Sequence, residues 1–192
     1  MYKILLVQPN YSHQRKTGGW GLNPPLGLCY VAALLKVAGQ SVEILDANVL
    51  NLDPWQVVMY AAQNNFNEVG VSVLTPAHDY ACQIAKMLPK HIMSVAGGPH
   101  ASAVPEEMIA GGFNKVFVGE AEAGTDIIEG LLPVRSLLKN NGMDKPYYSA
   151  GTRYFPWAPV VSSRGCPYDC YYCNKKTFGY KFRPRIAESV AG

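Results

Sequence analysis

The sequence predicts an α/β fold with five parallel strands in a doubly wound sheet, and three observations support this prediction. Short apolar runs alternate with longer amphipathic segments along residues 1–132. Glycine, proline and helix-capping residues stand between these segments, where the chain is expected to turn. The alternation gives five strand–helix units, which is typical of βαβ units and a parallel sheet. We therefore expect the flavodoxin-like strand order 2-1-3-4-5.

The individual elements follow from local signals. Lys3–Gln8 is a short apolar run and forms the first expected strand. Leu26–Val37 has a wide apolar face and is followed by Gly39, a common helix stop. Asp53 and Pro54 mark a helix start, because aspartate caps helix N-termini and proline suits the first helical position. The expected strands are 3–8, 41–46, 68–74, 92–96 and 115–118. The expected helices are 26–37, one that begins at 54, 76–88, 105–110 and 121–132.

The alternation ends after residue 132. Residues 133–158 contain asparagine, glycine, proline and tyrosine with little periodic apolar sequence. We interpret them as a linker that packs on its neighbours through aromatic side chains, with one helical turn at 135–139. Residues 159–163 predict a new strand. The expected organisation is an α/β domain at 1–132, a linker at 133–158 and the start of a second domain at 159–192.

The composition restricts the class of protein. With 48% hydrophobic and 16% charged residues, the chain is globular in character. Lys and Arg number 17 against 14 acidic residues, and no basic run occurs, so nucleic-acid binding is not indicated. No run approaches the roughly 20 apolar residues that span a membrane. The N-terminus lacks the features of a signal peptide, so the expected compartment is the cytoplasm, where disulfides are rare.

Three of the five cysteines, Cys166, Cys170 and Cys173, form a C-x3-C-x2-C motif. In a reducing compartment such clustering favours metal binding. Three thiolates can hold a cubane iron–sulfur cluster and leave its fourth iron open. Zinc usually has four protein ligands, yet no histidine follows Cys173, and Cys29 and Cys82 fall within expected helices as small buried side chains. An iron–sulfur cluster is the favoured interpretation, with zinc and three unrelated thiols as alternatives.

Residues 162–173 read Ser-Ser-Arg-Gly-Cys-Pro-Tyr-Asp-Cys-Tyr-Tyr-Cys, which resembles the first strand and cluster loop of radical SAM barrels. The resemblance implies that Cys166, Cys170 and Cys173 bind a 4Fe–4S cluster. It also implies that the fourth iron takes the amino and carboxylate groups of S-adenosylmethionine. Tyr172, an aromatic residue directly before the last cysteine, is typical of this motif and is expected to contact the cofactor.

The loops expected at the carboxyl ends of the strands resemble those of the cobalamin-binding domain that precedes many radical SAM barrels. Ser72-x-Leu74 and Gly97-Gly98 match two of the three cofactor motifs of that fold. The resemblance implies a groove for the nucleotide tail of B12, since glycine permits close approach to a ligand. The cofactor-binding residues implied are Ser72, Leu74, Gly97, Gly98, Pro99, His100, Gly119 and Glu120.

The third motif of that fold, D-x-H-x-x-G, is absent from this sequence. The first loop offers Asn10-Tyr11-Ser12-His13 with a different spacing, so cobalamin is expected without a protein histidine on cobalt. Two of the implied contacts also have simpler interpretations. His100 is equally well a capped loop histidine, and Glu120 equally well provides helix N-terminal charge.

Residues 174–192 follow the last cysteine, whereas a barrel needs on the order of 200 residues. We therefore expect the N-terminal part of a cobalamin-dependent radical SAM enzyme, either a fragment or a truncated product, that is inactive alone because the barrel is missing. The reaction implied is methyl transfer or cyclisation by a radical route, with cobalamin and S-adenosylmethionine as partners. The alternatives are a stand-alone cobalamin- or ligand-binding module and a cofactor-free docking domain.

Overall fold

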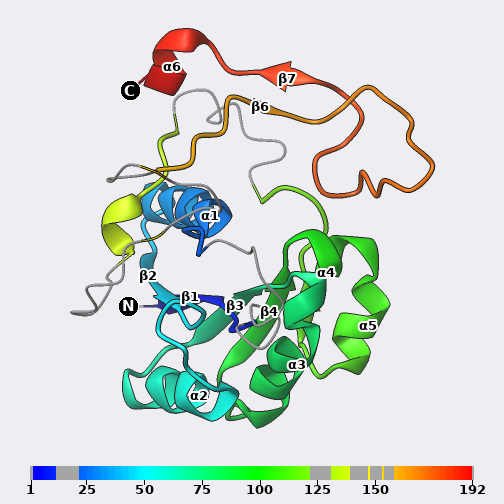
Figure 1. Ribbon diagram of the computed structural model, residues 1–192. Coiled ribbons are helices and arrows are strands. Elements are labelled where there is room, and N and C mark those ends of the chain that lie inside the picture. The colour runs from blue at the N-terminus through cyan, green and yellow to red at the C-terminus, as the bar shows by residue number, and fades with distance from the viewer. Residues whose placement is uncertain are drawn as a thin grey trace.

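The computed structural model describes residues 2–11, 22–121, 131–138, 147, 153 and 158–191. A five-stranded, all-parallel sheet with the order β2-β1-β3-β4-β5 forms its centre (Figure 1). The strands are β1 (Lys3–Gln8), β2 (Ser41–Asp46), β3 (Glu68–Ser72), β4 (Met93–Gly97) and β5 (Lys115–Val116). The predicted fold class and strand order are confirmed.

Helices cover both faces of the sheet. One face packs against α1 (Leu26–Val37), and the other against α2 and α3, as Figure 1 shows. The bounds of the remaining helices are α2 (Pro54–Gln63), α3 (His78–Met87), α4 (Pro99–Ala103) and α5 (Pro105–Ala110). Strands buried on both faces explain why the sequence shows apolar runs rather than strict alternation.

The two faces differ in how completely they are filled. Leu5 and Val7 of β1 belong to the large core on the α2–α3 face, whereas Ile4 and Leu6 pack with α1 in a smaller core. The register aligns Leu6 of β1 with Gly70 of β3. Because Gly70 has no side chain, β3 contributes none to the α1 face at that position. This difference leaves space over β3 on the α1 face.

Tertiary hydrogen bonds move several element ends from their predicted places. Strand β3 ends at Ser72 rather than at residue 74. The Val73 N–H still donates to the Gly97 carbonyl (2.7 Å), but Pro99 has no N–H to continue the ladder, and the Val73 carbonyl accepts from the His100 N–H instead (3.0 Å). A 3-10 turn at Thr75–Ala77 then delays α3. Strand β5 is also two residues shorter than predicted. Helix α4 was not predicted, and residues 122–130 of the last expected helix lie outside the described residues.

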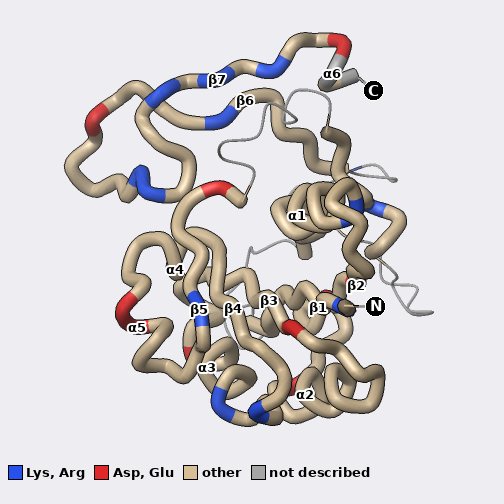
Figure 2. The backbone as a smooth tube through the Cα atoms, turned by 180° about the vertical axis from the view of Figure 1, so that it is seen from behind, with Lys and Arg blue, Asp and Glu red and all other residues tan. Residues whose placement is uncertain are grey.

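The last described segment, residues 158–191, forms a two-stranded antiparallel ribbon and a short helix. These elements are β6 (Ser163–Arg164), β7 (Arg183–Pro184) and α6 (Ala187–Ala191). The sequence predicted a strand slightly earlier, at 159–163, and it did not predict β7. Basic positions recur along this segment, which lies beyond α1 in Figures 1 and 2. In the expected linker, a 3-10 turn at Arg135–Leu137 falls within the predicted helical turn.

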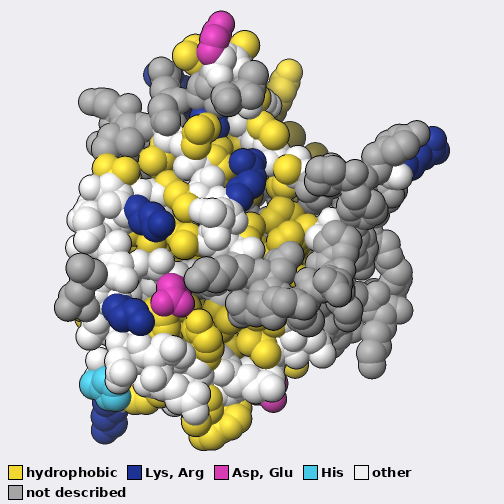
Figure 3. All heavy atoms as spheres, turned by 90° about the vertical axis from the view of Figure 1, so that its left-hand side faces the viewer, with side chains coloured by type: hydrophobic (Ala, Val, Ile, Leu, Met, Phe, Trp, Pro, Cys, Tyr) yellow, Lys and Arg dark blue, Asp and Glu magenta, His cyan; other side chains and the backbone are white. Residues whose placement is uncertain are grey.

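Charged side chains are dispersed on the face of the molecule in Figure 3. Among the described side chains visible there, Lys and Arg are separated by hydrophobic and uncharged groups. No helix in the described ranges is both long enough and apolar enough to cross a membrane.

The start of α2 provides a test of how far local signals stabilise the fold. Asp53 Oδ1 accepts a hydrogen bond from the Gln56 backbone N–H (2.8 Å), and Gln56 Oε1 accepts one from the Asp53 N–H (2.9 Å). We predict that Asp53→Ala lowers the free energy of unfolding by about 1 kcal/mol, because the Gln56 N–H loses the side-chain acceptor that caps it. Urea unfolding measures the loss. Asp53→Asn keeps an acceptor oxygen and is the control; equal stability of both variants and the parent would contradict the prediction.

Candidate functional site

A cavity of about 790 Å³ lies between the α1 face of the sheet and the segment that carries the cysteine motif. Three parts of the chain line it. The sheet contributes residues of β1, β3 and β4, and α1 contributes an apolar wall that includes Leu28, Val31 and Leu35. Residues 163–166 and 173–179 close the space on the other side. The cavity is therefore shared by two regions of the chain that are distant in sequence.

The floor of the cavity consists of small residues. Aligned residues of parallel strands point to the same face, and the register places Leu6, Gly70 and Val95 in one row and Ser72 beside Gly97 in the next. All five line the cavity. Because two of them are glycines and one is serine, a shallow trench runs over the ends of β3 and β4.

The turn after β4 requires glycine. Gly98 has a φ of 93°, and a Cβ there would lie 3.1 Å from the Val73 nitrogen and 3.3 Å from Ser72 Oγ. Both values are too close for a comfortable contact, and a positive φ also favours glycine. Gly119, after β5, likewise has a positive φ of 91°, and its N–H donates to Ser102 Oγ (3.0 Å). These turns let the backbone border the cavity directly.

A buried carboxylate joins the sheet domain to the ribbon. Glu120 is 7% exposed, and its Oε1 accepts a hydrogen bond from Arg183 Nη2 at 2.6 Å. Arg164 Nη1 lies 3.7 Å from the other carboxylate oxygen. The Arg164 guanidinium also lies over the Tyr30 ring, 5.0 Å from its centre, and Arg185 donates to the Tyr30 hydroxyl at 2.6 Å. Glu120 and Tyr30 therefore hold β6 and β7 against the sheet domain.

The cysteine loop leaves β6 through a glycine turn. Gly165 has a φ of 74°, and a Cβ there would collide with the carbonyl of Lys181. Cys166 and Cys173 both line the cavity, and both are exposed, whereas Cys170 is half-buried. The Cys173 N–H donates to the Cys170 carbonyl (3.0 Å), which folds the loop back on itself. The motif thus presents two of its thiols to the shared space.

The three sulfur atoms are not gathered around one point. Of the described residues, these cysteines do not form a group whose ligand atoms all lie within 4.8 Å of one another. A single zinc ion with Zn–S bonds of about 2.3 Å would hold its sulfurs roughly 3.8 Å apart. A multi-iron cluster binds each cysteine through a different iron and does not need that spacing. The donor set therefore fits a cluster better than one zinc ion.

The buried thiol of Cys29 and the half-buried phenol of Tyr147 both have raised pKa values. Burial raises the pKa of Cys29 to about 11, with Arg135 lowering it and Asp46 raising it. The Tyr147 hydroxyl donates to Asp46 Oδ2 (3.0 Å), and burial, together with this carboxylate, raises the Tyr147 pKa. Cys29 is fully buried in the small core that α1 forms with β1 and β2, so it acts as a core residue.

The structure brings together most of the residues that the sequence singled out. Those that line the cavity are Ser72, Gly97, Gly98, Pro99, Gly119, Glu120, Cys166 and Cys173. Those that do not line it are Leu74, His100, Tyr172 and Cys170. His100 lies instead against Thr75 and Glu107, and Tyr172 is 79% exposed with its ring edge-on to Tyr171. His13 lies outside the described residues.

Sequence reasoning missed Gly70, Tyr30 and Arg164 as parts of this site. An isolated glycine within a strand signals close approach of another group, and Gly70 stands in this position. Tyr30 is a polar-tipped residue on an otherwise aliphatic buried helix face. Nothing in the local sequence pairs Arg164 with Glu120, because this contact depends on the tertiary fold.

Comparisons with known proteins identify one family. The family model described as the B12 binding domain matches residues 21–129, more than half of the chain. A curated relative, an uncharacterized methyltransferase of Pyrococcus horikoshii, is 27% identical over 98% of this chain and 49% of its own length. The hopanoid C-3 methylase of Methylococcus capsulatus is also 27% identical, over 86% of this chain and 39% of its own. The chain thus spans half or less of the length of these relatives.

Solved structures share the fold. TsrM of Kitasatospora setae, a radical S-adenosylmethionine methyltransferase, has a TM-score of 0.64 and 16% identity, covering 100% of this chain and 44% of that one. OxsB, a cobalamin-dependent S-adenosylmethionine radical enzyme with aqua-cobalamin bound, has a TM-score of 0.65 and 16% identity, covering 98% and 30%. The family resemblance predicted from the sequence is confirmed.

The contact between Glu120 and the arginines leads to a stability prediction. Glu120→Gln removes the negative charge that faces two arginines, so we expect the free energy of unfolding to fall by about 2 kcal/mol. Trypsin should also cleave residues 158–191 faster than in the parent. Combining Glu120→Gln with Arg183→Gln in a double-mutant cycle should give a coupling energy of about 1 kcal/mol or more. Glu188→Gln, an exposed acid in α6, is the control; additive effects in the cycle would refute the contact.

Proposed function

Because the chain belongs to the B12-binding domain family, we propose that it works within a cobalamin-dependent radical SAM methyltransferase. Residues 1–132 would hold cobalamin, residues 133–158 would connect, and residues 159–192 would carry a 4Fe–4S cluster on Cys166, Cys170 and Cys173. Methyl transfer is the favoured reaction because both curated relatives are named as methyltransferases or methylases.

The observation that carries the cobalamin proposal is the trench of small residues in the cavity floor. Gly70, Ser72 and Gly97 leave room for a flat ring against the sheet, and Leu28 and Val31 of α1 offer it an apolar wall. The cavity volume of about 790 Å³ falls within the usual range for cofactor sites. It also lies over β1 and β3, where the strand order reverses, the place at which such sheets bind ligands.

Polar groups at the edge of the cavity would suit the polar parts of a nucleotide-bearing cofactor. The Gly97–Gly98 and Gly119 turns bring backbone close to the cavity without intervening side chains. The half-buried Ser72 hydroxyl is available as a hydrogen-bonding group at the same edge. His100 and Leu74 are not needed in this arrangement, because neither lines the cavity.

The cysteine loop supports the second half of the proposal. Cys166 and Cys173 border the same cavity, so a cluster held there would face the cobalamin site. When bound, the cluster supplies an electron to S-adenosylmethionine, and cobalamin supplies the methyl group. The residues of this chain would position the cluster. Glu120 and Tyr30 hold β6 and β7, and these strands place the cysteine loop over the trench.

The cobalamin proposal is tested by filling the trench. A Cβ on Gly97 would meet Phe117 at 3.9 Å, an ordinary contact, so Gly97→Val should fold while its side chain occupies the floor. After incubation with hydroxocobalamin and desalting, the parent should retain a red chromophore. Gly97→Val should weaken binding at least about tenfold, since bulk replaces ligand space. Met93→Val lies on the same face of β4 but outside the cavity and is the control. Equal retention by both variants would count against this site.

The cluster proposal is tested by metal content. Anaerobic reconstitution with iron and sulfide should give about four irons per chain and a brown absorbance. Replacing Cys166, Cys170 or Cys173 by alanine should abolish both signals, because each thiolate holds a separate iron. Cys29→Ala removes a buried thiol remote from the loop and should leave the iron content unchanged. Zinc uptake in place of iron, or full iron content in the alanine variants, would overturn the assignment.

A further inference from the structure

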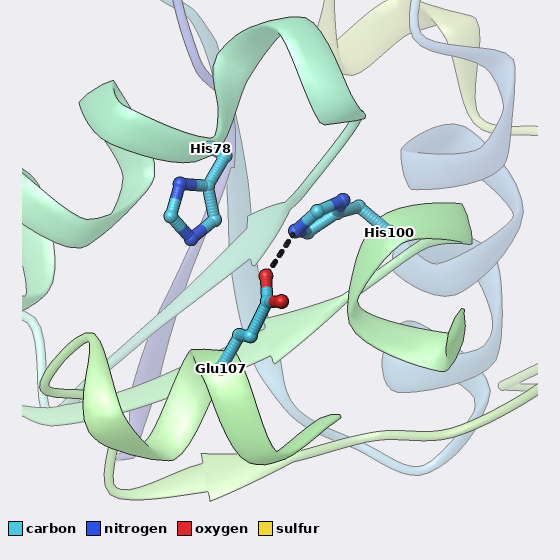
Figure 4. Close-up of side chains that lie close together, drawn as sticks. All are labelled: His78, His100 and Glu107. Carbon is cyan, nitrogen blue, oxygen red and sulfur yellow. Dashed lines mark ion pairs between the residues drawn. The ribbon is translucent and has the colours of Figure 1, made fainter. Parts of the chain in front are cut away.

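A second group of metal-binding side chains lies on the other side of the glycine turn, outside the cavity. His78 is the first residue of α3, His100 lies in α4 and Glu107 in α5. One ligand atom from each of the three lies within 4.8 Å of the other two. Figure 4 shows the His100 ring and the Glu107 carboxylate facing each other, with the His78 imidazole beside them. Three separate segments of the chain thus supply one compact donor set.

The outer nitrogen of each imidazole already has a partner. His78 Nδ1 lies 3.0 Å from Asp79 Oδ1, and a carboxylate can only accept, so this nitrogen carries a hydrogen. His100 Nδ1 lies 3.1 Å from Thr75 Oγ1. The Asp79 contact leaves His78 Nε2 with its lone pair, and the Thr75 hydroxyl does the same for His100 Nε2 when it accepts from Nδ1–H. Such contacts orient the rings of histidines that bind metals. In Figure 4 the Nδ1 atoms point away from the centre of the group.

Of the two inner imidazole nitrogens, His100 Nε2 has no hydrogen-bond partner and His78 Nε2 has only a weak one. His100 Nε2 is buried and forms no hydrogen bond, and its side chain is only 11% exposed. Its neighbour is Glu107 Oε2 at 3.5 Å. The thiol of Cys82 lies 3.5 Å from His78 Nε2 and is a weak donor. Lone pairs that converge in this way repel one another unless a cation lies between them, and a buried unpaired nitrogen needs an explanation.

The spacing fits a divalent metal ion. Zinc binds histidine nitrogen at about 2.0–2.1 Å and carboxylate oxygen at about 2.0–2.2 Å, so a tetrahedral site separates these two atoms by roughly 3.4 Å. The observed distance between His100 Nε2 and Glu107 Oε2 is 3.5 Å. Two imidazoles and one carboxylate also favour zinc over calcium or magnesium, which prefer oxygen ligands alone.

We propose that His78, His100 and Glu107 bind one zinc ion as its three protein ligands, with the fourth position left to water. The ion would join α3, α4 and α5 directly behind Gly98, whose other side borders the cavity. Zinc would therefore stabilise the turn rather than take part in the reaction. The competing interpretation is a protonated His100 paired with Glu107, which requires no metal.

Zinc affinity separates the two interpretations. The test uses the full chain with Cys166, Cys170 and Cys173 replaced by alanine, so that the cysteine loop does not contribute metal binding. Competition with a chromophoric zinc chelator should give one zinc per chain. Glu107→Gln and His78→Ala should each weaken binding at least tenfold; both side chains are partly exposed, so folding should be retained. The controls are Glu106→Gln and His91→Ala, which alter exposed residues outside the group and should bind zinc as the parent does.

Two further readouts complete the test. When cobalt replaces zinc, the parent should show the visible absorption of tetrahedral cobalt, and Glu107→Gln should not. Added zinc should raise the melting temperature of the parent and the controls but not of Glu107→Gln, because binding to the native state stabilises it. Zinc content below one per chain, or an unchanged affinity in Glu107→Gln, would overturn the site. None of these readouts uses cobalamin or iron, so the outcome is independent of the proposed function.

Discussion

The backbone of Val73 holds the turn at Gly97 and Gly98, and both candidate sites depend on this arrangement. Its N–H donates to the Gly97 carbonyl and its carbonyl accepts from the His100 N–H, at 2.7 and 3.0 Å. The ends of β3 and β4 are thereby joined beyond the sheet. Gly97 and Gly98 line the cavity, whereas His100 lies outside it, beside His78 and Glu107. A displacement of Val73 would therefore change the trench and the histidine pair together.

The ribbon of β6 and β7 depends on contacts with the rest of the chain for its stability. A two-stranded ribbon is marginal alone, and several of its aromatic side chains are exposed, with Tyr171 at 99% and Tyr180 at 65%. It gains support from Val161, which packs with Tyr30 and Leu131 in a small hydrophobic cluster. The charged contacts of Glu120 then determine how the ribbon is oriented.

Sequence signals predicted the sheet well because they are local. The apolar runs gave all five strands of the sheet in the right order, and Asp53 with Pro54 marked the start of α2 as observed. The errors occur where distant segments interact. Strand β3 ends where the Val73 carbonyl bonds the His100 N–H instead of continuing the ladder with β4, and α4 follows from the turn at Gly98, whose positive φ no periodicity predicts.

The same distinction applies to the candidate site. Motif residues such as Ser72, Gly97 and Cys166 were identified from their spacing, and the fold does bring them to one cavity. Gly70 was missed because its importance lies in the side chain it lacks opposite Leu6. His100 was grouped with the cavity because it follows the glycines in sequence. The helix that begins at Pro99 directs it to the opposite side.

The position of the cysteine loop over the trench thus rests on one desolvated carboxylate. Burying Glu120 is costly unless positive charge compensates it, and Arg183 and Arg164 provide that charge from the ribbon. Without the ribbon, Glu120 would be an uncompensated charge beside an apolar cavity. Without Glu120, Arg183 and Arg164 would lose the negative charge that they share. Each region therefore completes the electrostatics of the other, which makes their association specific rather than merely hydrophobic.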